Sequence, residues 1–270
     1  MVPDSIILDS IEKQRIEFDE IHRYRHVLFN LIKRNLGGRY GNMYLEFLRH
    51  IVIAMVTVAM YYIVFSSIRQ KPIDDYAFYL CTGVFVVSYI GGCMKTNAIK
   101  SNMKYISKMY FPRILAPLAD CISRMITFII TYSLAIIFGL CLGHQFDPAI
   151  LLLLPVWIII LFLFGFGCSM MMSTLTTLNR DIQYAFGFIY GFLIWITPTF
   201  FLISDAGSAL DQIIWYNPLT YFVEVFHSIL YTCTIPSVKC VAGSLILTAA
   251  FLIVGSILFF RYKDKFTEVA

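Results

Sequence analysis

Residues 95–124 read KTNAIKSNMKYISKMYFPRILAPLADCISR, and this segment decides how the chain is organised. It holds six basic residues and one acidic residue, and long apolar runs precede and follow it. Lys and Arg are retained on the cytoplasmic side when a membrane protein inserts. We therefore expect a cytoplasmic loop between two membrane spans. Its aromatic centre, Lys108–Arg113, indicates a surface that contacts a cytoplasmic partner.

The composition is typical of a helical membrane protein. Of the 270 residues, 59% are hydrophobic and 14% are charged, whereas a soluble domain is about half apolar and about a quarter charged. The apolar runs are continuous, unlike the short alternating segments of a transmembrane β-barrel. The net charge of +4 does not indicate nucleic-acid binding, because the basic residues flank apolar runs instead of forming a soluble basic face.

Six runs approach the length of about 20 residues that a helix needs to cross the hydrocarbon core. The predicted fold is therefore an all-α polytopic membrane protein with six transmembrane helices. These cover about residues 47–68, 78–94, 114–142, 149–175, 184–203 and 241–260. Seventeen basic residues fall on one side of these spans, and only Arg69, Lys71 and Lys239 fall on the other. This asymmetry predicts that both termini lie in the cytoplasm.

The regions outside the spans divide the chain further. Residues 1–46 form a cytoplasmic segment in which apolar residues recur at helical spacing between residues 18 and 43. This pattern predicts an interfacial amphipathic helix, with a soluble helix docking on a partner as the alternative. Residues 47–261 form the transmembrane domain, and residues 262–270 form a cytoplasmic tail. Residues 204–239 hold two apolar stretches too short to span, which we interpret as outer re-entrant helices.

Catalytic signatures are missing from the sequence. It contains no Walker A pattern, no HExxH, no GxSxG and no dense His/Cys/Asp cluster. We therefore predict no catalytic, cofactor or metal site in this chain. The span interiors hold few charges, which argues against ion-coupled transport. The seven cysteines form no CxxC pair, and a disulfide between Cys233 and Cys240 stays open.

Aromatic residues crowd two of the predicted spans and have two readings. They either face lipid and the membrane interface, or they line a path for a glycan, since sugars stack their apolar C–H faces on aromatic rings. The candidate path residues are Tyr61, Tyr62, Phe65, Tyr184, Phe188 and Tyr190. Two GxxxG pairs, Gly139/Gly143 and Gly187/Gly191, are weak indications of close helix approach.

Five blocks, taken in order, support a family resemblance. They are Leu31–Tyr40 (LIKRNLGGRY), Lys108–Leu115 (KMYFPRIL), Asn179–Asp181 (NRD), Tyr216–Thr220 (YNPLT) and Phe260–Phe266 (FRYKDKF). Together they resemble the membrane subunit of type-2 ABC exporters, specifically the permeases that export O-antigen, capsule or teichoic acid. The resemblance extends over nearly the whole chain, and the order of the blocks carries more weight than any block alone.

The resemblance implies a homodimer with two copies of a separate ATPase, which binds ATP and Mg, and a polyprenyl- or lipid-linked glycan as cargo. It implies a cytoplasmic coupling helix at about residues 98–112, with the contact residues Lys104, Lys108, Tyr110, Phe111 and Arg113. It also implies that the outer re-entrant region closes the exit, with the candidate gate residues Trp215, Tyr216, Asn217 and Pro218.

Two other functions compete with glycan export. A type-2 ABC permease for drugs or lipids would share the architecture but carry other cargo. A membrane-embedded glycosyltransferase or ligase would need paired carboxylates or a conspicuous Arg in a long outer loop. The outer acids, Asp205, Asp211 and Glu224, are scattered instead.

Overall fold

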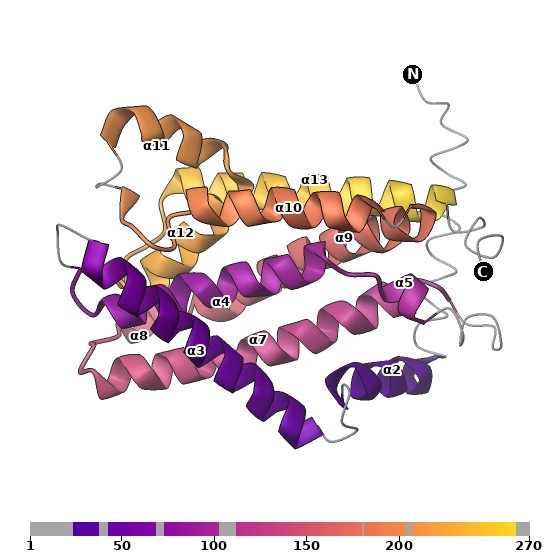
Figure 1. The fold of residues 1–270 in the computed structure, drawn as a ribbon, viewed down its shortest axis with the longest axis horizontal. Helices are drawn as coiled ribbons and strands as arrows, with labels where there is room; N and C mark the ends of the chain where they lie inside the picture. Colours follow the sequence, from indigo (N-terminus) through magenta and orange to yellow (C-terminus); the bar gives the residue numbers. More distant parts are fainter. Residues whose placement is uncertain are drawn as a thin grey trace.

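The computed structural model describes residues 24–37, 43–68, 73–102, 112–179, 181–203 and 207–262. Every regular element in these ranges is a helix (Figure 1). The elements are α2 (Arg25–Gly37), α3 (Met43–Ile68), α4 (Tyr76–Met94), α5 (Ala98–Ser101), α7 (Leu115–Cys141), α8 (Pro148–Leu151), α9 (Leu154–Leu178), α10 (Asp181–Ile196), α11 (Gly207–Tyr216), α12 (Pro218–Leu230) and α13 (Val238–Tyr262).

Within the described ranges, five segments are helical, long and apolar enough to cross a membrane. They are Phe47–Ser67, Tyr76–Met94, Leu115–Cys141, Pro148–Leu178 and Val238–Tyr262, and each overlaps one of the predicted spans. The chain is thus an all-helical, multi-pass membrane protein.

The predicted span at about residues 184–203 differs from the structure. Helix α10 has 16 residues and ends at Ile196, not at Ile203. Pro198 explains the early end, because the residue before a proline is driven out of the helical conformation and proline offers no N–H to continue it. Turns and bends occupy residues 197–201 instead, so α10 alone is shorter than the roughly 20 residues of a straight span.

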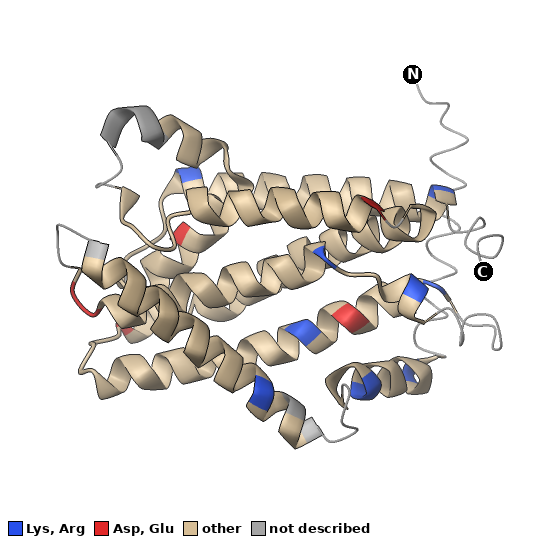
Figure 2. Cartoon of the chain, in the orientation of Figure 1, with Lys and Arg blue, Asp and Glu red and all other residues tan. Residues whose placement is uncertain are grey.

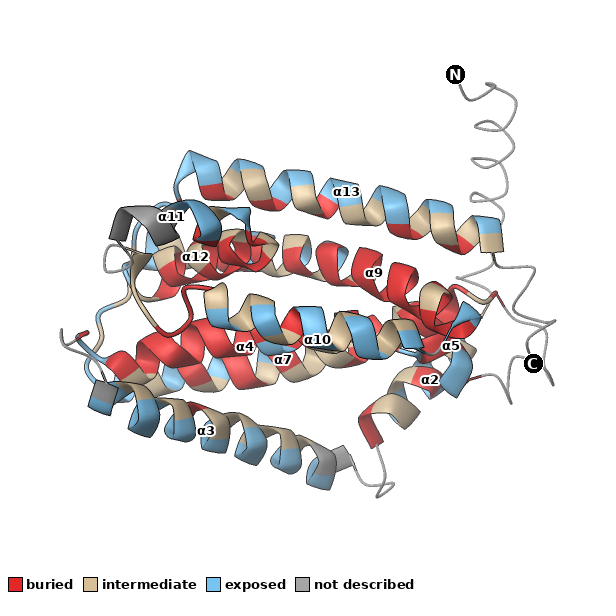
Figure 3. Ribbon diagram, turned by 45° about the horizontal axis from the view of Figure 1, so that its top comes forward, coloured by how far each residue is buried: buried red, intermediate tan, exposed pale blue. Residues whose placement is uncertain are grey.

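Helix α4 is the centre of the bundle and packs against α3, α7, α9, α10 and α12. Most of its residues are buried (Figure 3), as expected for a helix that is apolar on all sides. Helices α9 and α13 approach each other closely through two glycines. A Cβ built on Gly255 would lie 2.4 Å from the carbonyl oxygen of Gly167, so neither position has room for a larger residue.

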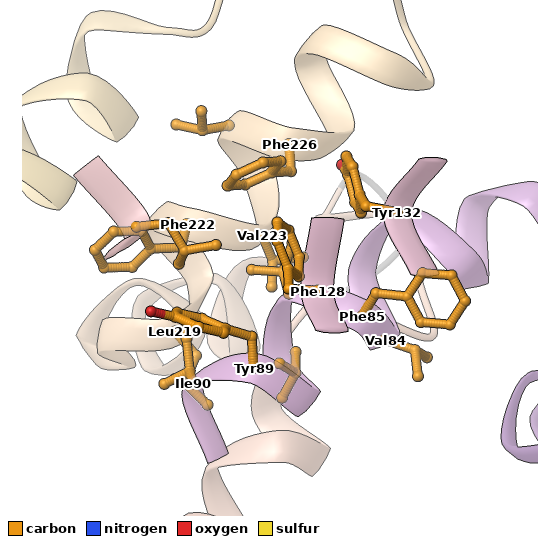
Figure 4. Packing of buried hydrophobic residues seen from close by; sticks show 14 of the residues in the cluster. Val84, Phe85, Tyr89, Ile90, Phe128, Tyr132, Leu219, Phe222, Val223 and Phe226 are labelled. Carbon is orange, nitrogen blue, oxygen red and sulfur yellow. The ribbon is translucent and has the colours of Figure 1, made fainter. Parts of the chain in front are cut away.

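Helix α12 does not span the bundle, yet its apolar face is buried in it. Phe226 of α12 packs edge-on against Phe128 and Tyr132 of α7, with ring centroids 5.9 and 5.4 Å apart (Figure 4). Phe222 packs against Phe164 of α9, with the ring centroids 4.4 Å apart. The apolar face of α12 is therefore surrounded by the other helices of the bundle.

Helix α3 lies at the edge of the bundle, on the side away from α13 (Figures 1 and 3). Only Val58 is buried among its described side chains, and its outer face is apolar. Helix α2 is placed beside α7, where Leu31 packs in one cluster with Leu115 and Ala119.

Charged residues are concentrated at one end of the molecule. The basic residues of α2, α5 and the C-terminal turn of α13 share the right-hand end in Figure 2. The other end, near α11 and α12, shows little blue and a few red segments (Figure 2), and Lys239 lies in the first turn of α13. The charge asymmetry of the sequence therefore corresponds to two ends of the folded bundle.

Candidate functional site

Two of the candidate path residues on α3 contact the turn that follows α10. The ring of Phe65 stacks on that of Phe200, with the ring centroids 4.8 Å apart and the ring planes 9° from parallel. The ring of Tyr61 meets Phe200 edge-on, with the centroids 4.7 Å apart. Phe200 is itself 3% exposed. The first and fifth predicted spans are therefore joined by aromatic contacts, through a residue that the sequence did not single out.

Tyr190 is buried inside the subunit. Its hydroxyl donates a hydrogen bond to the carbonyl oxygen of Val87, and its ring covers Gly91, where a Cβ would lie 2.4 Å from the ring. The ammonium of Lys95 lies 5.0 Å from the ring centroid. Tyr190 and Tyr61 line one cavity of about 380 Å³, between α3, α4 and α10.

The other candidate path residues face outward. Tyr184 and Phe188 on α10 are 65% and 69% exposed. Tyr62 on α3 is 44% exposed and lies 6.0 Å from the ring of Tyr76. The candidate path residues are thus divided between a cavity inside the subunit and two exposed helix faces, which are open to lipid or to a second copy of the chain.

Asn217 is the best-anchored of the candidate gate residues. Its side-chain oxygen accepts a hydrogen bond from the backbone N–H of Leu219 at 3.0 Å, which caps α12. Its amide nitrogen donates to the carbonyl oxygen of Leu193 and to the hydroxyl of Thr197, both at 2.8 Å. Because Leu193 lies on α10, one buried side chain fixes the start of α12 to the end of α10. Pro218 follows at the first helical position, where its missing N–H costs nothing.

The other two gate residues lie near the surface, at the end of the molecule that holds α11 and α12. The ammonium of Lys239 lies 3.6 Å above the ring of Trp215, while Tyr216 is 86% exposed. These three residues, with Gln212 and Tyr221, line a shallow cavity of about 330 Å³. The hydroxyl of Tyr221 donates to the carbonyl oxygen of Trp215 at 2.8 Å, which ties α12 to α11.

Two tyrosines of α4 hold the turn between α10 and α11, and the sequence analysis missed both. The hydroxyl of Tyr79 lies 2.8 Å from the carbonyl oxygens of Pro198 and Phe201. The hydroxyl of Tyr76 donates to the carbonyl oxygen of Phe200 at 3.0 Å. Nothing in the local sequence of α4 indicates this role, because the acceptors lie about 120 residues later in the chain.

Two titratable groups of α12 lie in the interior of the bundle. His227 is 3% exposed and its ring centroid lies 4.1 Å from that of Tyr79. Burial lowers the pKa of His227 to about 3, so its ring is neutral at physiological pH. Burial also raises the pKa of Glu224 to about 7. Helix α12 therefore carries no permanent cation within the bundle.

Of the predicted coupling residues, only Arg113 is described. It lies in the turn before α7, and its Nη1 atom is buried with no hydrogen-bond partner among the described residues. Lys104, Lys108, Tyr110 and Phe111 lie outside the described residues. The coupling surface thus stays a prediction, while the described flanks, α5 and α7, place its two ends at the basic end of the molecule.

Beside this surface, one acidic residue of α7 is linked to the end of α4. The carboxylate of Asp120 accepts hydrogen bonds from Nε and Nη2 of Arg124, at 2.8 and 3.2 Å. It also accepts one from the hydroxyl of Thr96 at 2.7 Å. A bidentate Arg–carboxylate pair is among the stronger polar contacts in proteins. The turn after α4 is therefore fixed to α7.

The described residues show no arrangement typical of a catalytic metal site. Within those ranges, no three His, Cys, Asp or Glu side chains come together as metal ligands. The seven cysteines are all free thiols. Cys233 contacts the carbonyl oxygen of Gln145 at 3.4 Å, whereas Cys240 is buried at the start of α13, so the two are not joined as a disulfide.

A buried central helix, long apolar helices and short helices at one end define the chain as a multi-pass helical membrane protein. The chain belongs to the ABC-2 type transporter family, which matches residues 26–231. Members of this family are the membrane subunits of transporters whose ATPase is a separate subunit.

Similar proteins extend over almost the whole chain. One is the O-antigen export system permease protein RfbA of Myxococcus xanthus, which is 22% identical over 256 residues, or 92% of this chain and 97% of the relative. Two proteins of the same name from Klebsiella pneumoniae are 26% and 25% identical over 253 residues, or 90% of this chain and 95% of each relative.

Proposed function

We propose that the chain is the membrane subunit of an ATP-driven exporter that threads a lipid-linked polysaccharide from the cytoplasm to the outer side of the membrane. The observation that carries this proposal is the near full-length similarity to three O-antigen export permeases. Two copies of the chain and two copies of a separate ABC ATPase, which binds ATP and Mg, would form the exporter in the plasma (inner) membrane.

The topology follows from the charge distribution. With the basic end in the cytoplasm, both termini lie inside, and α10 with residues 197–203 completes a sixth crossing. Residues 1–46, with α2 as the interfacial helix, and residues 262–270 are then cytoplasmic, around a transmembrane domain of residues 47–261. Helices α11 and α12, within about residues 204–239, enter the membrane from outside as re-entrant helices, and the burial of α12 supports this assignment.

Threading is favoured over enclosure because of the available volume. Ligand pockets hold about 300–1,000 Å³, and the cavity that holds Tyr61 and Tyr190 measures about 380 Å³. A polymer of many sugars cannot fit there. We therefore place the path between two copies of the chain, where the exposed faces of α3 and α10 would meet. Aromatic rings on those faces, such as Tyr184 and Phe188, bind sugars weakly at many points, and weak binding at several sites permits movement.

The experiment that tests the cargo is complementation. A strain that lacks this chain should lose its surface polysaccharide while keeping the cytoplasmic lipid-linked precursor, and the intact chain should restore export. Alanine variants of Tyr61, Tyr62, Tyr184 and Tyr190 should reduce export while protein level and ATPase assembly persist. Normal surface polysaccharide in the deletion strain would contradict the proposed cargo. Normal export by all four variants would instead leave the aromatics facing lipid.

The coupling surface has its own test. Replacing Tyr110 and Phe111 together with Ala removes the aromatic contact proposed to seat in a groove of the ATPase, with Lys104, Lys108 and Arg113 at its basic rim. Recovery of the ATPase with the purified double variant should fall. Unchanged recovery would mean that the aromatics only precede Pro112 at the start of the third span.

A further inference from the structure

The cavity beside Tyr190 is one part of a longer groove along α3. Two further cavities, of about 190 and 200 Å³, lie between α3 and α7, and the first is completed by α4 and the second by α2. All three are lined by Arg124, and each shares other residues with a neighbour, such as Gly92, His50 and Thr127. The three cavities therefore form a single groove at the loosely packed edge of the bundle.

The groove is electropositive near the basic end of the molecule. Arg124, Lys95 and Arg49 line it, together with one acid, Asp120. Asp120 already binds Nε and Nη2 of Arg124, so its charge is offset within that pair. Lys95 adds a positive charge to the groove beside this pair. An ionisable residue at membrane depth is rare and points to function.

The free side of the Arg124 guanidinium faces the groove. Nη1 makes no hydrogen bond among the described residues, and it lies over Gly92, where a Cβ would approach it to 2.6 Å. A larger residue at position 92 would displace the guanidinium from this place against α4. On the same wall, Lys95 is exposed at the C-terminus of α4. Arg N–H groups and a Lys ammonium are the groups that proteins use to bind phosphate oxygens.

The position of the groove suits an amphiphile. Its outer wall is α3, whose exposed apolar residues include Leu48, Val52 and Val56 in the half nearer its N-terminus. A lipid could therefore keep its hydrocarbon chain in the bilayer beside α3 while its headgroup enters between α3 and α7. A soluble anion would not need an apolar wall of this kind.

We propose that this groove binds the phosphate or diphosphate group of a lipid-linked substrate, with the Nη1 side of Arg124 and the ammonium of Lys95 as its ligands. The inference rests on the proposed function for the identity of the substrate, but the site is defined by its charges and its position. Binding here would hold the lipid end of the substrate at the cytoplasmic mouth of the path, next to Tyr61 and Tyr190.

The test measures binding of geranylgeranyl diphosphate to the assembled complex with its ATPase, in phosphatidylcholine nanodiscs without nucleotide. Competitors are geranylgeraniol, phosphatidylglycerol and inorganic diphosphate. The wild type should bind labelled geranylgeranyl diphosphate saturably. Unlabelled geranylgeranyl diphosphate should displace it, whereas the three competitors should displace it poorly. Equal competition by geranylgeraniol would overturn the proposal, because the headgroup would not be recognised. Equal competition by phosphatidylglycerol would overturn it in favour of a general phospholipid site, and equal competition by inorganic diphosphate would exclude a role for the lipid chain.

Two variants assign the ligands. The double variant Asp120→Asn/Arg124→Gln removes both charges of the pair, so that no lone charge is left in the interior. Lys95→Gln leaves that pair intact and decides the question even if the double variant fails to assemble. Each should weaken binding by about tenfold or more, since a charge-assisted hydrogen bond is lost.

Arg261→Gln is the matched control, because it removes an exposed cation at the same end of the molecule, on α13, away from the groove. It should bind like the wild type. Unchanged binding by Lys95→Gln, or a loss in Arg261→Gln equal to that of Lys95→Gln, would refute the site. A complex that exports polysaccharide but fails this test contradicts the headgroup site alone, whereas diphosphate binding without polysaccharide export contradicts the proposed cargo alone.

Discussion

Replacing Asn217 with Ala should release the proposed outer gate from the bundle. Asn217 caps α12 and joins it to α10 through two donated hydrogen bonds. Loss of an N-cap costs about 1 kcal/mol, and each buried hydrogen bond contributes about 1 kcal/mol. The side chain is 3% exposed, so water cannot replace these bonds without entering the bundle. The expected loss in the free energy of unfolding is about 3 kcal/mol.

A matched control is available at the start of α8. Asp147 also precedes a proline and caps its helix, with its side-chain oxygen accepting from the N–H of Ala149 at 2.9 Å. That residue is exposed and no further hydrogen bond of its side chain is found among the described residues. Asp147→Ala should therefore cost about 1 kcal/mol or less. Asn217→Ser, which keeps a capping oxygen but lacks the amide donors, should fall between the two.

Thermal unfolding of the purified complex, followed by tryptophan fluorescence, measures the order of these variants, and surface polysaccharide measures their export. Asn217→Ala should unfold at a clearly lower temperature than Asp147→Ala and should export less. Equal unfolding temperatures for these two variants would refute the reasoning, because the two donated hydrogen bonds would then contribute nothing.

Three further predictions concern other parts of the chain. Gly167→Ala should lower the yield of folded protein because a Cβ there would lie 2.7 Å from the backbone nitrogen of Leu252, whereas Gly187→Ala, with nothing within 4 Å in the subunit, should not; equal yields on size-exclusion chromatography would contradict this. In a cysteine-free background, a thiol at position 147 should be labelled from outside and one at position 101 only after permeabilisation; the reverse pattern would invert the topology. Tyr190→Phe removes the hydrogen bond to α4 but keeps the ring. The free energy of unfolding should therefore fall by about 1 kcal/mol, seen as a lower unfolding temperature, while export continues. Loss of export at normal stability would instead assign the hydroxyl to the path.

Much of the fold could be predicted from the sequence, because the membrane imposes simple rules. Apolar length predicts which segments cross, and basic residues predict which side of the membrane they face. Five of the six predicted spans coincide with helices of sufficient length. The exception is the segment after Ile196, where the apolar run continues but the helix does not. Hydropathy cannot separate helix from turn there, and Pro198 was the available signal.

The close helix crossing could not be predicted. The two GxxxG pairs pointed to residues 139/143 and 187/191. Of these, Gly139 is tightly packed, since a Cβ there would lie 2.8 Å from the ring of Phe78, but Gly143, Gly187 and Gly191 have nothing within 4 Å among the described residues. The backbone-to-backbone crossing uses Gly167 and Gly255 instead. A spacing of four marks one face of one helix, but it does not say which helix faces it. That choice depends on how α9 and α13 are oriented, and only the packed bundle decides it.

The sequence by itself determined the class of protein, the number of long apolar segments and the charge difference between the two ends, since each depends on residue type and order along the chain. Only the tertiary structure decided which aromatic residues turn inward. Tyr190 and Tyr184 lie on the same short helix, yet one is buried against Gly91 and the other is exposed. Likewise, Arg124 reaches the groove only because α3, α4 and α7 meet around it. Contacts between residues far apart in the chain depend on helix orientation and side-chain packing, and no local pattern encodes them.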